Sequence, residues 1–145
     1  MPKPHLIILN DAFVRGVLKQ AWEDSEPGSA MPHEEGGFVV RDSAGAFQVH
    51  RWPKGAQNEI CVPPHSGCKV GEGEIVASFH THPNTSGDYL QEPSETDKRA
   101  VRNDPNLKGA DYVGEFVISQ DTIYLITPTG QVRELADTND LFSDQ

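Results

Sequence analysis

Basic side chains are few in this sequence, and they are spread along it. The chain holds 12 Lys and Arg against 22 Asp and Glu, which gives a net charge of −10 at pH 7. Neutralising the phosphates of a nucleic acid requires a cluster of Lys and Arg, and the sequence has none. We therefore expect no nucleic-acid partner. The acidity favours solubility or a partner with a basic face, and composition does not choose between these.

Long apolar runs and cysteines are also scarce. No stretch approaches the roughly 20 apolar residues of a membrane span, and residues 1–5 do not have the basic-then-apolar pattern of a signal peptide. We therefore expect no membrane association and a cytoplasmic location. The two cysteines, Cys61 and Cys68, stand in a stretch rich in Pro and Gly, where a disulfide is geometrically feasible. Because the cytosol is reducing, we expect both to be free thiols.

The apolar residues, 36% of the total, are grouped into short runs separated by Gly and Pro, which indicates a folded chain. A length of 145 residues is typical of one domain. Residues 136–145 are expected to form a frayed acidic tail. The rest predicts a mixed α/β (α+β) domain with a largely antiparallel sheet flanked by helices.

Periodicity and turn residues predict the individual elements. The expected helices are one capped by Asn10 that ends within residues 23–28, and one capped by Ser94 that ends near Asn103. Irregular stretches are expected over residues 53–73 and 84–93. The expected strands are residues 37–41, 46–52, 60–62, 74–79, 112–119, 122–127 and 131–135.

A possible metal site follows the buried strand at residues 74–79. Two histidines at i and i+2 at the end of a strand project to the same side, so His80 and His82 can bind one ion. A catalytic zinc ion that keeps one position open needs a third ligand. Asp97, in the first turn of the helix capped by Ser94, is the candidate. Each motif alone is also consistent with a chance pair of histidines and an ordinary helix cap.

The order and approximate spacing of His80-Thr81-His82-Pro83 and Ser94-Glu95-Thr96-Asp97 resemble the signature of the JAMM (JAB1/MPN-plus) zinc metalloisopeptidases. The resemblance covers residues 6–135 and includes a Glu-x-Gly-Gly-apolar start of the first strand at residues 34–38. The chain departs from the family in having ten residues between Pro83 and Ser94. About seven are usual there, and three extra loop residues are tolerable because the flanking elements set the ligand geometry.

The resemblance implies an MPN/JAB-like, cytidine-deaminase-like fold for residues 1–135. It implies that His80, His82 and Asp97 bind Zn²⁺. Glu34 becomes the general base, since it rather than the adjacent Glu35 matches the Glu-x-Gly-Gly pattern. By the same resemblance, the hydroxyl of Ser94 helps to hold the tetrahedral oxyanion.

The function implied by the resemblance is a deubiquitinase-like isopeptidase. It would cleave after the C-terminal glycine of a ubiquitin-like protein, as in bacterial antiphage conjugation systems. A JAB-like toxin or a general processing metallopeptidase is the alternative within the enzyme class. A non-catalytic MPN scaffold is the alternative outside it, although scaffolds of this family normally have ligands missing. Neither the substrate's identity nor the oligomeric state follows from the sequence.

Other residues also permit a metal interpretation. Cys61, His65 and Cys68 could form part of a second zinc site, but their spacing matches no common zinc knuckle and a fourth ligand is not apparent. His33 and His50 are expected at the surface or just behind the site.

Overall fold

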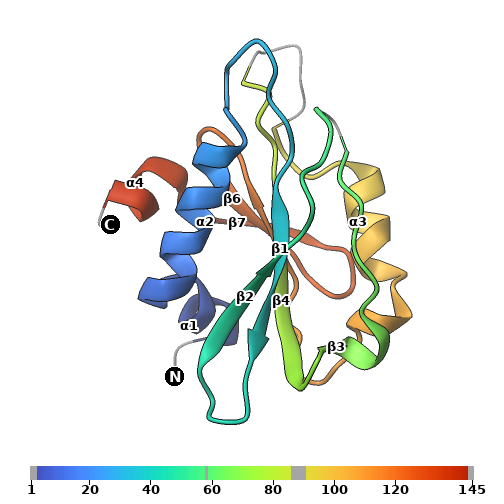
Figure 1. Cartoon of the computed structure of the whole chain (residues 1–145). Coiled ribbons are helices and arrows are strands. Elements are labelled where there is room, and N and C mark those ends of the chain that lie inside the picture. The colour runs from blue at the N-terminus through green and yellow to red at the C-terminus, as the bar shows by residue number, and fades with distance from the viewer. Residues whose placement is uncertain (1–2, 58, 86–90, 144–145) are drawn as a thin grey trace.

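One sheet runs through the middle of the molecule, and helices cover both of its faces (Figure 1). The computed structural model describes residues 3–57, 59–85 and 91–143. The fold is mixed α/β with a mostly antiparallel open sheet, as the sequence predicts. In chain order the elements are α1 Pro4–Asn10, α2 Ala12–Asp24, β1 Gly36–Arg41, β2 Phe47–Arg51, the short 3₁₀ helix η1 Ser66–Cys68, β3 Lys69–Val70, β4 Gly73–Thr81, α3 Glu95–Arg102, the 3₁₀ helix η2 Pro105–Leu107, β5 Glu115–Ile118, β6 Thr122–Ile126, β7 Val132–Asp137 and α4 Thr138–Ser143.

The strand order is β2-β1-β4-β5-β6-β7, and β3 pairs with the beginning of β4. Among the described strands, β4 and β5 form the one parallel pair. Parallel neighbours need a long crossover connection, and here the crossover contains α3. The crossover brings the beginning of α3 back to the place where β4 ends.

One face of the sheet is covered by α1, α2 and α4. The apolar stripe of α2 is fully buried at Val14, Leu18 and Ala21, the spacing of one helix face, and it packs in a core that includes Phe79 of β4. The helix begins one residue later than predicted. Its N-cap is Asp11, whose carboxylate accepts from the Val14 amide (3.0 Å). The predicted cap, Asn10, is instead the last residue of α1, because the preceding apolar residues form a helix of their own.

The other face is covered by α3 and the segment that follows it. Val101 of α3 and Leu107 are buried against Phe38 of β1 and Ile75 of β4 in a second core. The helix has its predicted cap at Ser94 and ends at Arg102, in agreement with the sequence. Because Val101 is the one buried residue of α3, this helix covers the face only in part.

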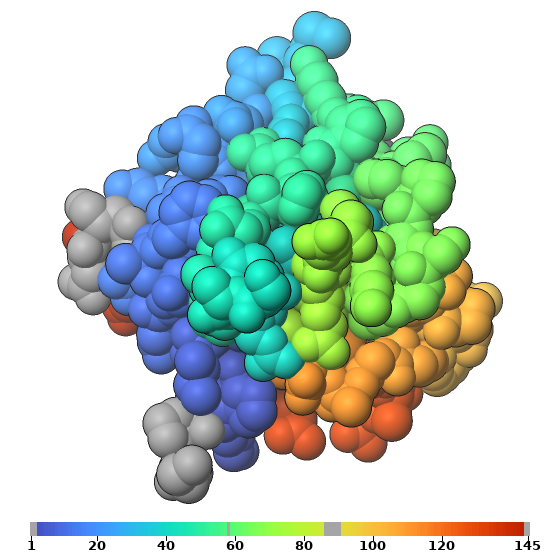
Figure 2. Space-filling view, turned by 60° about the horizontal axis from the view of Figure 1, so that its bottom comes forward, coloured from blue at the N-terminus to red at the C-terminus, as the bar shows by residue number. Residues whose placement is uncertain are grey.

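At the end of the sheet away from His80, the β1–β2 turn and the β3–β4 turn lie side by side (Figure 2). Arg41 stands at the end of β1. Its Nη2 atom lies 2.6 Å from the carboxylate of Glu74 and 2.7 Å from that of Asp111. These ion pairs tie the two turns to the segment before β5.

Two predicted features are wrong. Residues 136–143 are not a frayed tail, because β7 continues to Asp137 and α4 follows, with Phe142 only 7% exposed in the core beside α2. Apolar contact of Phe142 outweighs the acidity of its neighbours. Residues 60–62 form no strand, and Ile60 and Val62 instead line a cavity.

Part of the predicted loop over residues 84–93, namely residues 86–90, lies outside the described residues, as do residues 144–145 of the predicted tail. No helix within the described ranges is long and apolar enough to cross a membrane.

Candidate metal centre

Three predicted ligands meet where β4 ends. His80 is the second-last residue of β4 and His82 follows the strand, and their Nε2 atoms are 3.2 Å apart. Asp97, in the first turn of α3, places Oδ2 at 3.1 Å from Nε2 of His82 and Oδ1 at 3.5 Å from Nε2 of His80. Within the described residues, this is the group of His, Cys, Asp or Glu side chains that could hold a metal ion.

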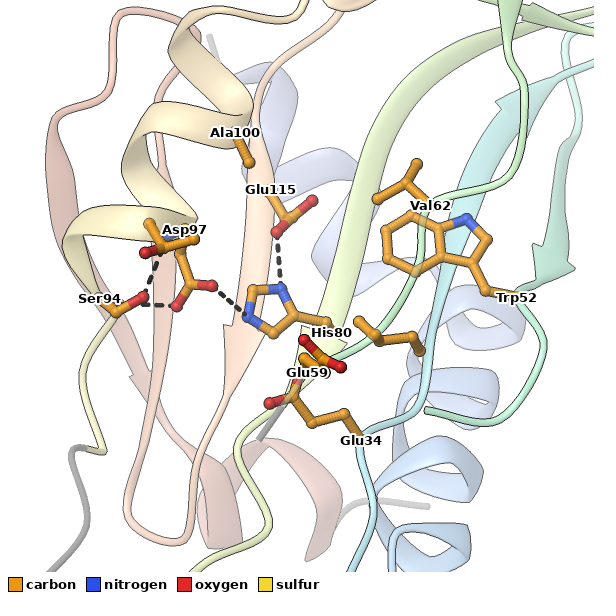
Figure 3. Close-up of a pocket in the computed structure, with 11 residues that line it drawn as sticks. Glu34, Trp52, Glu59, Val62, His80, Ser94, Asp97, Ala100 and Glu115 are labelled. Carbon is orange, nitrogen blue, oxygen red and sulfur yellow. Dashed lines mark hydrogen bonds and ion pairs between the residues drawn. The ribbon is translucent and has the colours of Figure 1, made fainter. Parts of the chain in front are cut away.

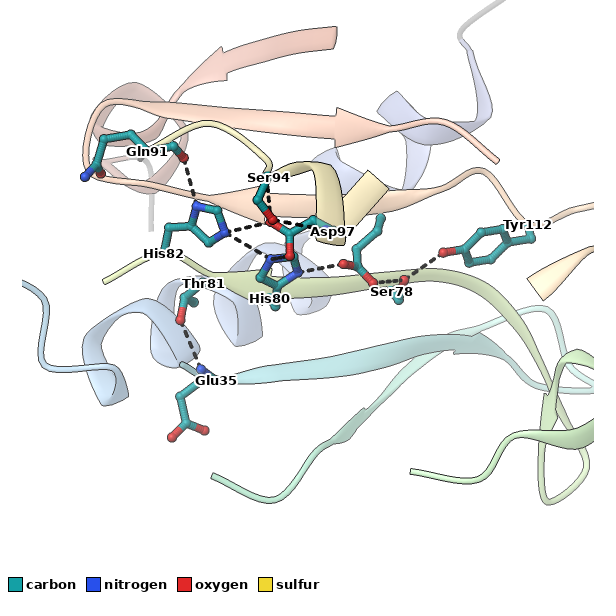
Figure 4. A network of polar contacts seen from close by, with 10 residues as sticks. Glu35, Ser78, His80, Thr81, His82, Gln91, Ser94, Asp97 and Tyr112 are labelled. Carbon is teal, nitrogen blue, oxygen red and sulfur yellow. Dashed lines mark hydrogen bonds and ion pairs between the residues drawn. The ribbon is translucent and has the colours of Figure 1, made fainter. Parts of the chain in front are cut away.

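The second nitrogen of each histidine is held by an acceptor (Figure 4). Nδ1 of His80 donates to Oε2 of Glu115 (2.6 Å), and Nδ1 of His82 donates to the backbone carbonyl of Gln91 (3.0 Å). A carbonyl oxygen only accepts, so His82 must carry its proton on Nδ1. Histidine ligands of metals usually have such a partner, which fixes the tautomer and directs the Nε2 lone pair at the ion.

When each histidine carries its proton on Nδ1 alone, the Nε2 lone pairs of His80 and His82 and the carboxylate of Asp97 face one another, and they repel unless a metal ion or a proton lies between them. Without a metal ion, a proton is favoured there, and the pKa of His80 is shifted accordingly. Burial lowers it, but the carboxylates of Glu115 and Asp97 outweigh burial and raise it well above its usual value. The pKa of Asp97 is raised by burial but pulled well below its usual range by hydrogen bonds from the two histidines. Two imidazoles and one carboxylate match the three-ligand set of a catalytic zinc ion.

A capping box holds Asp97 in place. The amide of Asp97 donates to Oγ of Ser94 (3.1 Å), and the amide of Ser94 donates to Oδ2 of Asp97 (2.9 Å). One carboxylate oxygen therefore completes the cap and also faces His82. The Ser94 hydroxyl accepts in this cap, so its own proton remains available for donation, and Ser94 lines the adjoining cavity.

The adjacent glutamates Glu34 and Glu35 have different surroundings, although each is 7% exposed. The carboxylate of Glu35 is tied to Nη2 of Arg51 (2.6 Å) and Nε2 of His33 (2.5 Å), and it points away from the histidine pair (Figure 4). Glu34 lines the cavity beside His80 (Figure 3). Among the described residues, the Glu34 carboxylate has no hydrogen-bond partner.

Burial raises the pKa of Glu34 to about 7, with the carboxylates of Asp97 and Glu115 adding to burial and His80 opposing it. A buried, unpaired carboxylate with a pKa near neutrality can accept and return a proton at physiological pH. Of the two glutamates, Glu34 alone therefore has the geometry of a general base in this cavity.

The threonine between the two histidines fixes the position of Glu34. Thr81 faces the other side of β4, where its hydroxyl accepts from the Glu35 amide (3.0 Å) and contacts the Ser25 hydroxyl (2.5 Å) at the end of α2. On the opposite edge, the Glu34 amide donates to the carbonyl of Ala56 (2.8 Å). The segment that carries the glutamates is thus anchored on both sides.

The Gly-Gly pair after the glutamates is required by packing. A Cβ on Gly36 would lie 2.5 Å from the Trp52 ring and 2.7 Å from the Phe79 carbonyl oxygen, and a Cβ on Gly37 would lie 2.8 Å from the His50 carbonyl oxygen. Glycine lets β1 approach both neighbours closely, with Gly36 opposite His80.

The cavity beside the histidines has a volume of about 390 Å³. Its floor carries the acidic groups and His80, while one wall is formed by Trp52, Ile60 and Val62 and the other by the first turns of α3 (Figure 3). A cavity in which apolar side chains stand beside converging polar and ionisable groups is a usual form of a substrate site.

Sequence reasoning missed Glu115, which orients His80, and the backbone carbonyl of Gln91. A charged residue that opens the apolar strand β5 was the available signal for Glu115. No sequence signal identifies a backbone carbonyl as an acceptor.

The other metal candidates do not form a cluster in the described structure. Both cysteines are free thiols, as predicted, with Cys61 exposed and Cys68 buried. His65 is bound to Asp104 (Nε2 to Oδ2, 2.6 Å). Two other histidines lie as expected, with His50 exposed and His33 buried against Glu35 just behind the site.

No family model, curated protein or solved structure matches this chain. The residues themselves bring together a buried His80 and the partly buried His82 and Asp97, a group that could bind a metal ion.

Proposed function

We propose that the chain is a zinc-dependent peptidase of the JAMM type, with His80, His82 and Asp97 as metal ligands. The observation that carries the proposal is the convergence of two Nε2 atoms and one carboxylate beside a buried, unpaired glutamate. The match of these residues to the JAMM signature supports the same conclusion.

The residues of the chain fit the steps of peptide hydrolysis. A bound zinc ion would supply Lewis acidity, which polarises the scissile carbonyl and lowers the pKa of the attacking water. Glu34 takes a proton from that water as its oxygen bonds to the carbonyl carbon. The same proton passes to the leaving amine when the carbon–nitrogen bond breaks. The Ser94 hydroxyl donates to the carbonyl oxygen as negative charge develops on it.

The substrate that we propose is the C-terminal tail of a ubiquitin-like protein, cleaved after its glycine. The groove between α3 and the segment containing Ile60 and Val62 has room for a few extended residues but not for a folded domain. The body of the substrate would then be held on the surface and supply binding energy that places the tail.

The first test uses a matched pair of variants. Glu34→Gln should abolish peptide hydrolysis while keeping zinc and fold, whereas Glu35→Gln should keep hydrolysis, since Glu35 faces Arg51 and His33. Turnover, metal content and circular dichroism are measured for both. Activity retained in Glu34→Gln and lost in Glu35→Gln would refute the assignment of the base.

The second test concerns the substrate. Three substrates are offered: a ubiquitin-like protein fused through its terminal glycine to a reporter, the same fusion with a bulky residue in place of glycine, and the isolated tail peptide. We expect appreciable cleavage of the first alone, with loss on chelation. Equal cleavage of all three would favour a general peptidase or a toxin. No cleavage by a zinc-loaded, folded chain would favour a scaffold.

A further inference from the structure

A network of buried hydrogen bonds leads from His80, through Glu115 at the cavity, into the second core (Figure 4). Beyond the His80–Glu115 contact, Oε1 of Glu115 lies 2.8 Å from Oγ of Ser78, and that hydroxyl lies 2.7 Å from the hydroxyl of Tyr112. Ser78 is fully buried, Tyr112 is 5% exposed and Glu115 is 7% exposed. Neither catalysis nor metal ligation, as proposed above, uses Ser78 or Tyr112.

The direction of each hydrogen bond follows from the groups that meet. An Nε2 atom that binds a metal has no proton, so His80 donates from Nδ1 to Oε2 of Glu115, and the hydroxyl of Ser78 donates to Oε1 of the same side chain. The Ser78 oxygen is then free to accept from Tyr112. Burial, with the nearby Glu115 charge, raises the pKa of Tyr112 well above its usual value, so Tyr112 stays a neutral donor. Every link therefore polarises the next toward His80.

The register of the sheet brings the residues of this hydrogen-bond network together. Ser78 and His80 point to the same face of β4, and the parallel pairing places Glu115 of β5 opposite Ser78. Tyr112 reaches the same point from within the second core, among apolar side chains such as Ile75 and Leu107. Burying a carboxylate there is costly, and apolar residues of similar volume would serve stability at least as well. This energetic cost is explained if the hydrogen-bond network orients His80.

We propose that Glu115, Ser78 and Tyr112 are positioning residues that hold His80 with its proton on Nδ1 and its Nε2 lone pair toward the ligand centre, and so set the affinity for the metal. The inference rests on the proposed function. His82 offers a contrast within the same site, because its Nδ1 is held by a backbone carbonyl that side-chain substitution does not remove. Side chains hold His80, so substitutions of those side chains change how strongly His80 binds the metal.

The test is the Zn²⁺ affinity of Glu115→Gln, Ser78→Ala and Tyr112→Phe, measured by competition with a chromophoric chelator. Glu115→Gln should bind Zn²⁺ about 10- to 100-fold more weakly than wild type, the usual loss for an outer-shell partner of a ligand. Ser78→Ala and Tyr112→Phe should show successively smaller losses. Ser119→Ala, a buried serine at the end of β5, and Tyr124→Phe on β6 are matched controls and should bind as wild type does.

A second measurement does not depend on activity. In the zinc-loaded protein, proton NMR of the imidazole N–H groups should place the Nδ1–H of His80 far downfield, and each of the three variants should move it upfield. The Nδ1–H of His82 is the internal reference and should stay in place. Tyr112→Phe removes a single oxygen atom, so this variant still tests the proposal if Glu115→Gln does not fold.

The outcomes separate the two proposals. A wild-type chain that takes up no Zn²⁺ refutes the proposed function and this inference with it. A wild-type chain that binds Zn²⁺, with all three variants binding equally and the His80 resonance unmoved, refutes the positioning role alone.

Discussion

Replacing Glu34 by glutamine should stabilise the metal-free protein above neutral pH. Burial raises the pKa of Glu34 from its ordinary value of 4.5 to about 7. A carboxyl group whose pKa is higher in the folded state favours folding when it is protonated. The contribution of Glu34 to stability is therefore fully present below pH 4.5 and is lost as the pH rises to about 7. Glutamine resembles the protonated acid in shape and charge, so the variant avoids that loss.

The magnitude follows from the same shift. A difference of about 2.5 pH units, at about 1.4 kcal/mol for each unit, gives about 3–4 kcal/mol in the free energy of unfolding. Glu34→Gln should thus match wild type near pH 4 and exceed its stability by about 3–4 kcal/mol at pH 8. The measurement is urea unfolding from pH 4 to 8 with a chelator present, followed by circular dichroism.

Glu35→Gln provides the matched control. The neighbouring carboxylate holds Arg51 and His33, so its replacement should destabilise the fold at pH 7 by about 1–3 kcal/mol, the cost of losing buried, charged hydrogen bonds. The two substitutions should therefore have opposite signs at pH 7. A stability difference between Glu34→Gln and wild type that stays constant from pH 4 to 8 would refute the reasoning. It would mean that Glu34 has the same pKa in the folded and the unfolded protein.

Three further outcomes are expected. Wild type should bind one zinc ion per chain, and His82→Ala should not retain it in elemental analysis, whereas stoichiometric zinc in the variant would overturn the ligand assignment. Ser94→Ala should lower kcat about 10²-fold through loss of an oxyanion donor, and should also cost about 1 kcal/mol of stability through loss of the cap. An unchanged kcat in steady-state assays would leave Ser94 as a cap alone. Phe142→Ala should cost about 3–5 kcal/mol in urea unfolding, while a negligible cost would contradict the docking of α4.

The sequence determined those parts of the candidate site that depend on local geometry. Alternation along a strand places His80 and His82 on one side of β4, and the Ser94 cap fixes Asp97 in the first turn of α3. Each rule acts within a few residues, so a reader of the sequence can apply it without knowing the fold. The same holds for the β1–β2 hairpin and the buried stripe of α2.

The tertiary structure decided which residue supports His80 and supplied the physical reason why Glu34, chosen from the sequence only by family resemblance, faces the cavity. Glu34 and Glu35 differ by one position, so their facing depends on the pairing of Gly36 with His80 and on the Thr81 anchor. Glu115 lies 35 residues from His80 and reaches it through the parallel register of β4 and β5. Register between distant strands is set by packing of the whole sheet, and a shift of one residue would turn each of these side chains to the opposite face.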